Sequence, residues 1–287
     1  MVLKEQRVDR AADATSWIDR ELAACGLADA RLDTRLRTLL EQIGDAVGES
    51  VPMVCQDWAN TKAAYRFFSN ERVDDADILA GHFRATKYRF TATKGPILVL
   101  HDTTEFSFQR DTLNNIVIIT ITHGRKGKDR PPKPCTLCGI LMHSTLGLTT
   151  EGLPFGLAAI NFWTTKQFKG TAALKTKLNT TRVPIEQREC VRWLENVRQS
   201  TATLGDPARC VHIGDRESDI YELFCTANDV GTHFLVRTCV DRLAGDGDHT
   251  VSVDMAEAKV RARHRVEVRH ANGNPDSSVS SAGGSSA

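Results

Sequence analysis

Two aspartates lie directly after short apolar runs and are candidates for metal-dependent chemistry. Asp102 follows the run at residues 97–100, and Asp215 follows the run at residues 210–213. A carboxylate at the C-terminal end of a buried strand lies at the edge where α/β sheets bind ligands. If the two strands are neighbours, repulsion between the acids favours a bound Mg²⁺ or Mn²⁺. The pair predicts phosphoryl chemistry, in which two ions about 3.5–4 Å apart activate water and stabilise the leaving oxygen.

Both aspartates also have a purely structural interpretation. Either one can end a strand in a turn, and Asp215 precedes a predicted helix that it can cap. A magnesium-dependent phosphatase of the haloacid-dehalogenase type is a second enzyme class, because Gly214-Asp215 with Asp219 fits its late motif. That class needs a second aspartate two positions after the first, and Thr104 occupies that position. The phosphatase therefore stays the less favoured alternative.

The elements that position these acids can be predicted from the spacing of apolar residues. Residues 17–22 and 32–43 carry helical stripes, and Asp74 resembles the cap of a further helix. Strand-like runs follow at residues 97–100, 116–121, 139–146, 157–162, 210–213 and 233–238, with helical stretches at 190–204 and after Asp215. Consecutive strands followed by strands that alternate with helices predict an α/β domain with a mixed sheet. We place the boundary between the helical domain and this core at residues 94 and 95.

Composition restricts the class of protein. The chain has 287 residues, 41% hydrophobic and 25% charged, as an ordinary globular protein does. It contains no run of about 18 apolar residues, and its first residues are charged, so we expect a cytoplasmic protein with reduced cysteines. The net charge of +1 provides no global attraction for nucleic acid, so any DNA binding must come from local patches.

Candidate DNA-binding patches occur in both halves of the chain. Residues 152–185 contain no Asp or Glu. We expect DNA contacts there from Trp163, Lys166, Lys169, Lys175, Lys177 and Arg182. In the helical domain, Arg31, Arg35 and Arg66 are expected to bind phosphates. For each patch, a solvated surface without a ligand is the alternative. We interpret Trp58, Tyr65, Phe67 and Phe68 as core residues of the helical domain, and His101 as a packed histidine on the opposite face of its strand from Asp102.

Several segments, in the same order, make the chain resemble a known family. They are Gly26-Leu27-Ala28-Asp29-Ala30-Arg31 with Arg35-Leu36, Lys62-Ala63-Ala64-Tyr65-Arg66-Phe67-Phe68-Ser69-Asn70, His101-Asp102-Thr103-Thr104, His143-Ser144-Thr145-Leu146-Gly147-Leu148 with Glu151-Gly152-Leu153-Pro154, and Gly214-Asp215-Arg216-Glu217-Ser218-Asp219-Ile220-Tyr221. Together they are similar to the DDE transposases of the bacterial insertion-sequence family that includes the composite kanamycin-resistance transposon. The similarity extends from about Ala12 to Arg269.

This resemblance implies a cut-and-paste DNA transposase, active in transposition and DNA recombination. The implied fold is a helical N-terminal DNA-binding domain (residues 1–94) followed by an incomplete ribonuclease-H-like mixed-sheet domain (residues 95–269). Asp102 and Asp215 match the first two carboxylates of the catalytic triad and would bind Mg²⁺ or Mn²⁺. The implied partner is double-stranded DNA at transposon ends, with a homodimer for a full-length protein, and the implied location is the cytoplasm, in association with the nucleoid.

The chain departs from the family pattern at the third carboxylate. The family has a late glutamate within a Tyr, Arg, Glu, Lys signature, whereas the glutamates after Glu222 are Glu257 and Glu267, and neither lies in such a motif. Residues 270–287 are rich in Asn, Gly, Ser and Ala, which predicts a disordered tail. We therefore expect a truncated copy that is inactive alone. A non-catalytic protein that binds transposon ends, or inhibits transposition, is the alternative function.

Overall fold

A computed structural model of the chain describes residues 16–109, 118–123, 134–163, 191–245, 247–269 and 275–283. The chain divides into two compact units, Met1–Val236 and Arg237–Ala287, and each is described by itself. The predicted boundary at residue 94 falls within the first unit, and the assignment of separate domains on either side of it stays a prediction.

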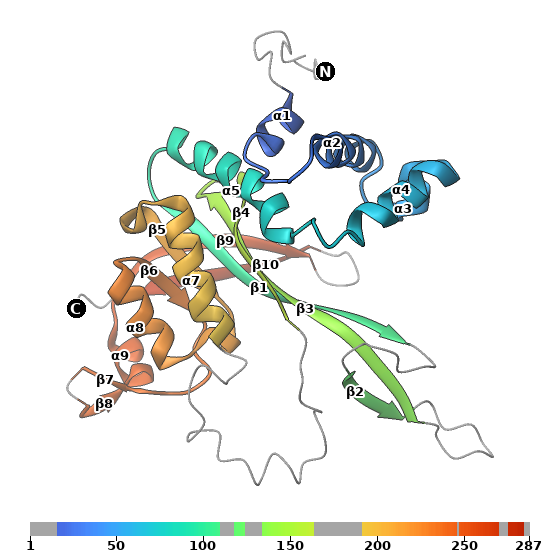
Figure 1. The fold of residues 1–287 in the computed structure, drawn as a ribbon. Helices are drawn as coiled ribbons and strands as arrows, with labels where there is room; N and C mark the ends of the chain where they lie inside the picture. The colour runs from blue at the N-terminus through green and yellow to red at the C-terminus, as the bar shows by residue number, and fades with distance from the viewer. Residues whose placement is uncertain are drawn as a thin grey trace, which may run out of the picture. The chain divides into compact units, whose positions relative to one another are not determined.

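Five helices form the N-terminal part of the first unit (Figure 1). They are α1 (Trp17–Leu22), α2 (Ala30–Asp45), α3 (Val51–Cys55), α4 (Trp58–Phe68) and α5 (Asp75–Ala92). Polar side chains begin four of them, because Ser16, Asp29, Asp57 and Asp74 accept hydrogen bonds from main-chain N–H groups of the first turn. The predicted stripes at residues 17–22 and 32–43 and the predicted cap at Asp74 are confirmed.

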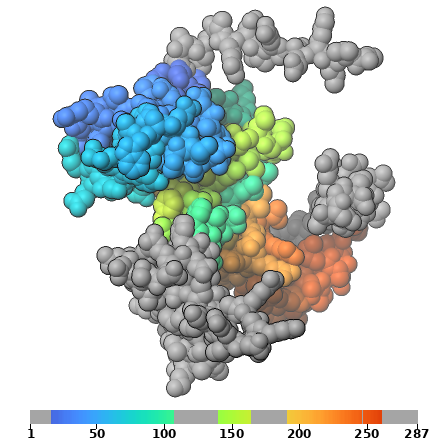
Figure 2. Space-filling view, turned by 90° about the vertical axis from the view of Figure 1, so that its right-hand side faces the viewer, coloured from blue at the N-terminus to red at the C-terminus, as the bar shows by residue number. Residues whose placement is uncertain are grey.

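The core of these helices uses one side of α4. Phe67 and Ala64 are buried with Leu36, Leu39 and Cys55. The expectation that Trp58, Tyr65 and Phe68 are core residues is wrong, because their side chains are 78%, 54% and 54% exposed. Tyr65 lies off the stripe of buried positions 61, 64 and 67, whereas Trp58 and Phe68 follow helical spacing to that stripe but are the first and last residues of α4 and stay exposed there. Figure 2 shows α1 to α5, coloured blue to cyan, gathered in one compact body.

A six-stranded mixed sheet follows the helices. Its strands are β1 (Ile97–Gln109), β2 (Ile118–His123), β3 (Pro134–Thr149), β4 (Pro154–Trp163), β5 (Cys210–Gly214) and β6 (His233–Val236). β3 pairs with β1 on one edge, and with β2 and β4 at different ends of its other edge, always antiparallel. β5 is parallel to both β1 and β6. The predicted fold class, a helical N-terminal region followed by an α/β mixed-sheet domain, is confirmed.

The two faces of the sheet differ in burial. Along β3, Leu141, His143, Thr145, Gly147 and Thr149 are buried and alternate with half-buried residues, as a strand with one covered face does. On the covered face, α5 and α7 (Val191–Leu204) contribute to a core that contains Phe90, Ile97, Val99, Phe155, Ala158, Leu204 and Cys210. Helix α8 (Tyr221–Val230) packs on α7 through Leu223. Two short 3-10 helices, η3 (Pro207–Arg209) and η4 (Arg216–Ser218), precede and follow β5.

The second unit contains two separate strand pairs and one helix among its described residues. β7 (Leu243–Ala244) pairs with β8 (His249–Thr250), α9 (Val251–Glu257) follows, and β9 (Val260–Arg269) pairs antiparallel with β10 (Pro275–Gly283). The composition of the last segment predicted no regular structure. The pairing of β10 uses main-chain groups that residues of any type carry, so a Ser- and Ala-rich segment can take part. No helix in the described part of the chain has the length and apolar character needed to cross a membrane.

Candidate DNA-binding and metal-binding sites

Asp102 lies inside a strand, which corrects the expectation that it ends one. β1 continues to Gln109, and Asp102 pairs with Ser144 of β3. The strand continues because the antiparallel ladder with β3 extends beyond the apolar run and satisfies the main-chain groups there. The parallel pairing with β5 does end close by, at Leu100 and Ile213. Asp102 therefore lies at the end of the part of β1 that β5 covers.

The pairing of β1 with β5 sets the two aspartates level. Asp102 lies two residues beyond Leu100, and Asp215 lies two residues beyond Ile213, which is the partner of Leu100. Neighbouring strands are about 4.8 Å apart, and both aspartates are exposed. The register therefore places Asp102 and Asp215 at the same edge of the sheet, and a shared ligand of their carboxylates stays a prediction.

A tight turn after β5 fixes the backbone of Asp215. Its Oδ1 accepts the N–H of Glu217 at 2.9 Å, and its carbonyl oxygen accepts the hydroxyl of Ser218 at 2.6 Å. A Cβ on Gly214 would lie 2.2 Å from the Ser218 Oγ, so this turn needs glycine at that position. Asp215 therefore caps η4, as the structural interpretation predicts. Within the described part of the chain, no group of three or more His, Cys, Asp or Glu residues is arranged to hold a metal ion.

Three buried histidines, His101, His143 and His212, lie on the covered face of the sheet. His101 is 7% exposed, and its Nε2 lies 2.8 Å from His212 Nδ1. Its Nδ1 lies 3.0 Å from the Thr145 hydroxyl, which confirms the prediction of a packed core histidine. Burial lowers the pKa of His101 far below its usual value and lowers the pKa of His212 to about 4. Burial and the nearby Arg192 lower the pKa of His143 to about 3, so this cluster is neutral at pH 7.

The exposed side of α4 combines basic and aromatic side chains. Trp58, Lys62, Tyr65, Arg66 and Ser69 are all exposed and recur at helical spacing, on the side of α4 away from its buried residues. The sequence of α4 contains no acidic residue. An 11-residue helix is about 16 Å long, and B-DNA has a major groove about 12 Å wide that admits a helix. We call this surface the α4 face.

Two of the arginines predicted to bind DNA, Arg31 and Arg35, are on α2. Arg31 is at the start of α2, and Arg35 contacts the start of α4. The Arg35 guanidinium donates to the Asn60 side chain at 3.2 Å, and Asn60 in turn is held by Asp57. The hydrogen bond that the main-chain N–H of Asn60 donates to Asp57 is the largest of the interactions that lower the pKa of this carboxyl. Arg31 has a side chain that is 93% exposed, 3.4 Å from Asp29. Arg35 thus connects α2 to α4, and Arg31 and Arg66 are at the surface.

Comparison with known protein families identifies this part of the chain. Residues 14–73 match the family described as Transposase DNA-binding. This segment is a transposase DNA-binding domain. It includes α1 to α4 and therefore the whole α4 face. Comparison of the chain with curated proteins gives no match.

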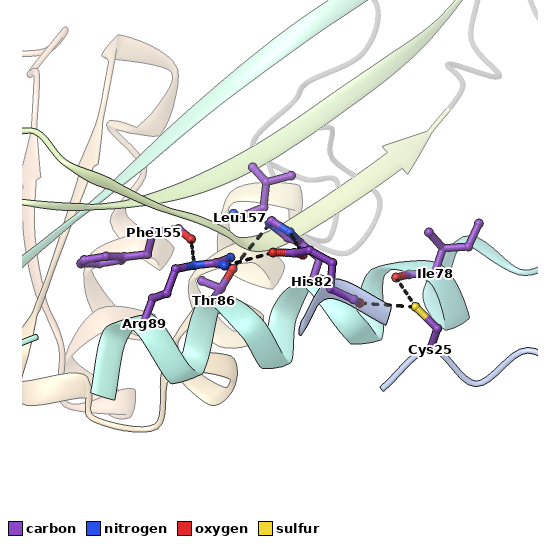
Figure 3. Close-up of polar contacts among 8 residues, drawn as sticks. Cys25, Ile78, His82, Thr86, Arg89, Phe155 and Leu157 are labelled. Carbon is purple, nitrogen blue, oxygen red and sulfur yellow. Dashed lines mark hydrogen bonds and ion pairs between the residues drawn. The ribbon is translucent and has the colours of Figure 1, made fainter. Parts of the chain in front are cut away.

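Polar contacts connect the transposase DNA-binding domain to the sheet through α5 (Figure 3). Glu21 of α1 lies 2.7 Å from His82 Nδ1 and 3.0 Å from Arg89 Nη1. Arg89 also donates to the carbonyl oxygen of Phe155, and His82 Nε2 accepts the N–H of Leu157 at 2.8 Å, both on β4. Since Nε2 is an acceptor, the proton of neutral His82 is on Nδ1, where it is donated to Glu21.

The electrostatics of this junction favour ionised Glu21. Burial raises the pKa of the Glu21 carboxyl, but hydrogen bonds from His82 and Arg89, together with the positive charge of Arg89, outweigh burial and lower it below its usual value. We call the contacts of Glu21 with His82 and Arg89, and of these two residues with β4, the α5 junction. No sequence pattern indicates this junction, because its members are far apart along the chain.

The other predicted DNA contacts lie in or beyond β4. Trp163 is half-buried, and the guanidinium carbon of Arg192 lies 4.9 Å from the centroid of its ring. Lys166, Lys169, Lys175, Lys177 and Arg182 lie outside the described residues. A role of these residues in DNA binding stays a prediction. Lys62, Tyr65 and Trp58 of the α4 face are not among the residues predicted from the sequence to contact DNA. The sequence pattern that could have indicated this face is the helical spacing of Lys62 and Arg66 in a segment without acids.

Proposed function

We propose that this chain binds double-stranded DNA at transposon ends and that the α4 face makes the main contact. The observation that carries the proposal is an acid-free, basic and aromatic helix face within a transposase DNA-binding domain. Lys62 and Arg66 would contact phosphates or guanine edges, and the exposed Tyr65 would pack on sugars or thymine methyl groups. Because the net charge is only +1, this local patch would supply most of the electrostatic attraction.

DNA selection followed by affinity measurement tests this proposal. Duplexes bound by the full chain are selected from a random library, and the dissociation constant of the best duplex is measured by fluorescence anisotropy. We expect Lys62→Ala with Arg66→Ala to weaken binding at least tenfold and to reduce discrimination between selected and random DNA, since each good base contact contributes about 1–3 kcal/mol. Arg198→Ala, on the exposed side of α7, is the matched control and should change neither quantity. Unchanged affinity in the α4 variant would refute the proposal.

For the core, we propose a ribonuclease-H-like fold with a partial metal site. The order β4-β3-β1-β5-β6, antiparallel up to β1 and parallel after it, supports this fold. Asp102 and Asp215 would hold Mg²⁺ or Mn²⁺, whose preferred ligands include carboxylate oxygens. A bound ion of this kind would activate water and stabilise charge on a phosphate oxygen. Two carboxylates fit a single ion but leave it incompletely coordinated by protein, and we propose no cleavage step through it.

We therefore propose that the chain as given binds DNA without cutting it and competes for transposon ends as an inhibitor. Fixing two metal ions requires more carboxylates than Asp102 and Asp215 provide, and Glu217 instead pairs with Arg192 at 2.8 Å. A nicking assay on supercoiled DNA that carries the selected sequence, with Mg²⁺ or Mn²⁺, should give no product above background. Metal-dependent nicking that Asp102→Ala abolishes would contradict this conclusion and would identify the chain as an active nuclease.

A further inference from the structure

A cavity of about 710 Å³ lies between α1 and α5, and none of its lining residues belongs to α4. Arg20 of α1 lines one side, and Arg84, Tyr88 and Arg89 of α5 line the other. The segment matched as a transposase DNA-binding domain ends at residue 73, whereas α5 begins at Asp75. Most of the cavity lining is therefore outside the region with a recognised function. We call this feature the α1–α5 cavity.

The lining of the α1–α5 cavity is positively charged. It contains three arginines and one acid, Asp19. Asp19 is already paired with Arg37 at 2.5 Å, and the hydrogen bond from Arg37 is the main cause that lowers its pKa. Arg89 is held in place by Glu21. With the two partners included, four arginines (Arg20, Arg37, Arg84 and Arg89) stand against two acids (Asp19 and Glu21), so positive charge is in excess around the cavity.

The side chains around the cavity suit a phosphodiester. A guanidinium group binds phosphate oxygens through parallel hydrogen bonds. Arg84 and Tyr88 are four residues apart on α5, so they project from the same side of the helix. Tyr88 is 71% exposed and offers a hydroxyl donor and an aromatic surface for a sugar. The volume is within the range of about 300–1,000 Å³ that sites for small ligands occupy, which is enough for a short length of DNA backbone.

The place of the cavity along the chain favours DNA as the occupant. Arg20 lies inside the matched transposase DNA-binding domain, and α5, which carries Arg84 and Tyr88, begins two residues after that domain ends. The cavity is thus partly lined by the domain that binds DNA, and its arginines complement the negative charge of the DNA backbone.

We propose that the α1–α5 cavity binds the phosphate backbone of DNA that flanks the sequence contacted by the α4 face. This inference rests on the proposed function, since it adds a second contact to the same bound duplex. The contact recognises phosphates and not bases, so it adds affinity without sequence discrimination. The cavity thereby extends the DNA-binding surface beyond the recognised domain and onto α5, the helix that contacts β4.

Two duplexes and two sets of variants test the inference. The short duplex contains only the selected sequence, and the long duplex adds about one helical turn of random sequence on each side, roughly 10 base pairs. We expect Arg84→Ala with Tyr88→Ala to weaken binding of the long duplex about tenfold and to reduce the log-log salt slope by about 0.9 for each phosphate that the protein no longer neutralises. This variant should bind the short duplex as tightly as the unmodified chain does. Arg84→Lys should retain part of the effect of the arginine, because the positive charge remains.

The outcomes separate this inference from the proposed function. Lys62→Ala with Arg66→Ala should weaken both duplexes, whereas the cavity variant should weaken only the long one, and Arg198→Ala should weaken neither. Equal affinity and salt slope for the cavity variant and the unmodified chain would overturn the inference and leave the proposed function standing. A loss of self-association in sedimentation, without a loss of DNA affinity, would assign the cavity to a second copy of the chain and would also overturn it. An unmodified chain that binds no duplex would refute both.

Discussion

At the scale of single residues, the three buried histidines behind the aspartates make stability depend on pH. His101, His143 and His212 have pKa values lowered by burial, to about 3 for His143 and about 4 for His212. In the unfolded chain a histidine has a pKa of about 6.5. Below that pH the unfolded state binds more protons than the folded state, so the free energy of unfolding falls as the pH falls.

The resulting prediction concerns acid unfolding. The contribution of neutral His212 is fully present above pH 6.5 and is lost as the pH falls from about 6.5 towards about 4. We expect a loss on the order of 2 kcal/mol per buried histidine between pH 7 and pH 5. Urea unfolding at several pH values measures it, and His212→Asn should reduce the slope with pH. A free energy of unfolding that stays constant from pH 7 to pH 5 would show that these histidines take up protons as readily in the folded state as in the unfolded chain.

A second prediction at this scale concerns the turn that carries Asp215. An alanine Cβ at position 214 would lie 2.2 Å from the Oγ and 2.7 Å from the Cβ of Ser218, so rotation of the serine side chain cannot relieve the clash. We expect Gly214→Ala to lower the free energy of unfolding by about 1–3 kcal/mol, as overpacked sites do. Adding Ser218→Gly should restore part of this loss. Additive losses in the double variant would mean that the two residues do not contact each other.

At the scale of elements, the spacing of apolar residues is sufficient to predict most strands and helices. All six strands of the sheet overlap the predicted runs, because strands of a covered sheet carry apolar residues that are visible in sequence. The end of β1 could not be predicted, because its second half is held by pairing with β3 and not by its own composition. The exposed aromatic residues of α4 were misassigned, because an aromatic residue alone does not reveal whether it faces a core or a ligand.

The contact between α1 and α5 gives a prediction for one helix pair. Gly81 lies in the middle of α5, where a Cβ would be 1.8 Å from the carbonyl oxygen of Glu21 and 2.8 Å from the sulfur of Cys25. Glycine is unfavourable in a helix by about 1 kcal/mol, so Gly81→Ala would be stabilising in an isolated helix. Here we expect the opposite, a loss of roughly 2 kcal/mol or more, because α1 must move away.

Thermal unfolding of Gly81→Ala measures this effect. Gly26→Ala is a suitable control, because the added Cβ would be 3.2 Å from the carboxylate oxygen of Asp77, at the end of a flexible side chain. The same displacement of α1 would disturb the α1–α5 cavity, so Gly81→Ala should also weaken binding of the long duplex. A stabilised Gly81→Ala variant would mean that α1 and α5 are not in close contact.

At the scale of the whole molecule, the helices that carry the α4 face and the sheet that carries the aspartates meet at α5, through the apolar core around Phe90 and through the α5 junction. Sequence similarity could indicate Asp102, Asp215 and α4 one by one, since each lies in a short continuous motif. It could not indicate the α5 junction, because Glu21, His82, Arg89 and the main chain of β4 come together only in the folded chain. The helices and the sheet fall within one compact unit, and the α5 junction is a physical reason for their coupling.

The last prediction is that Glu21→Ala uncouples the transposase DNA-binding domain from the sheet. Removing the carboxylate leaves the Nδ1–H of His82 and one side of the Arg89 guanidinium without their partner in a half-buried place, which is costly for a polar group. Calorimetry should then show two unfolding transitions in place of one, with the loop at residues 69–74, between α4 and α5, cleaved earlier by protease. Asp19 is on α1 like Glu21, and Asp19→Ala removes only its exposed pair with Arg37 of α2. This variant should therefore leave a single transition. One unchanged transition in Glu21→Ala would mean that close packing of α1 on α5, where Gly81 lies against the main chain of Glu21, holds the two parts together without the charged contacts.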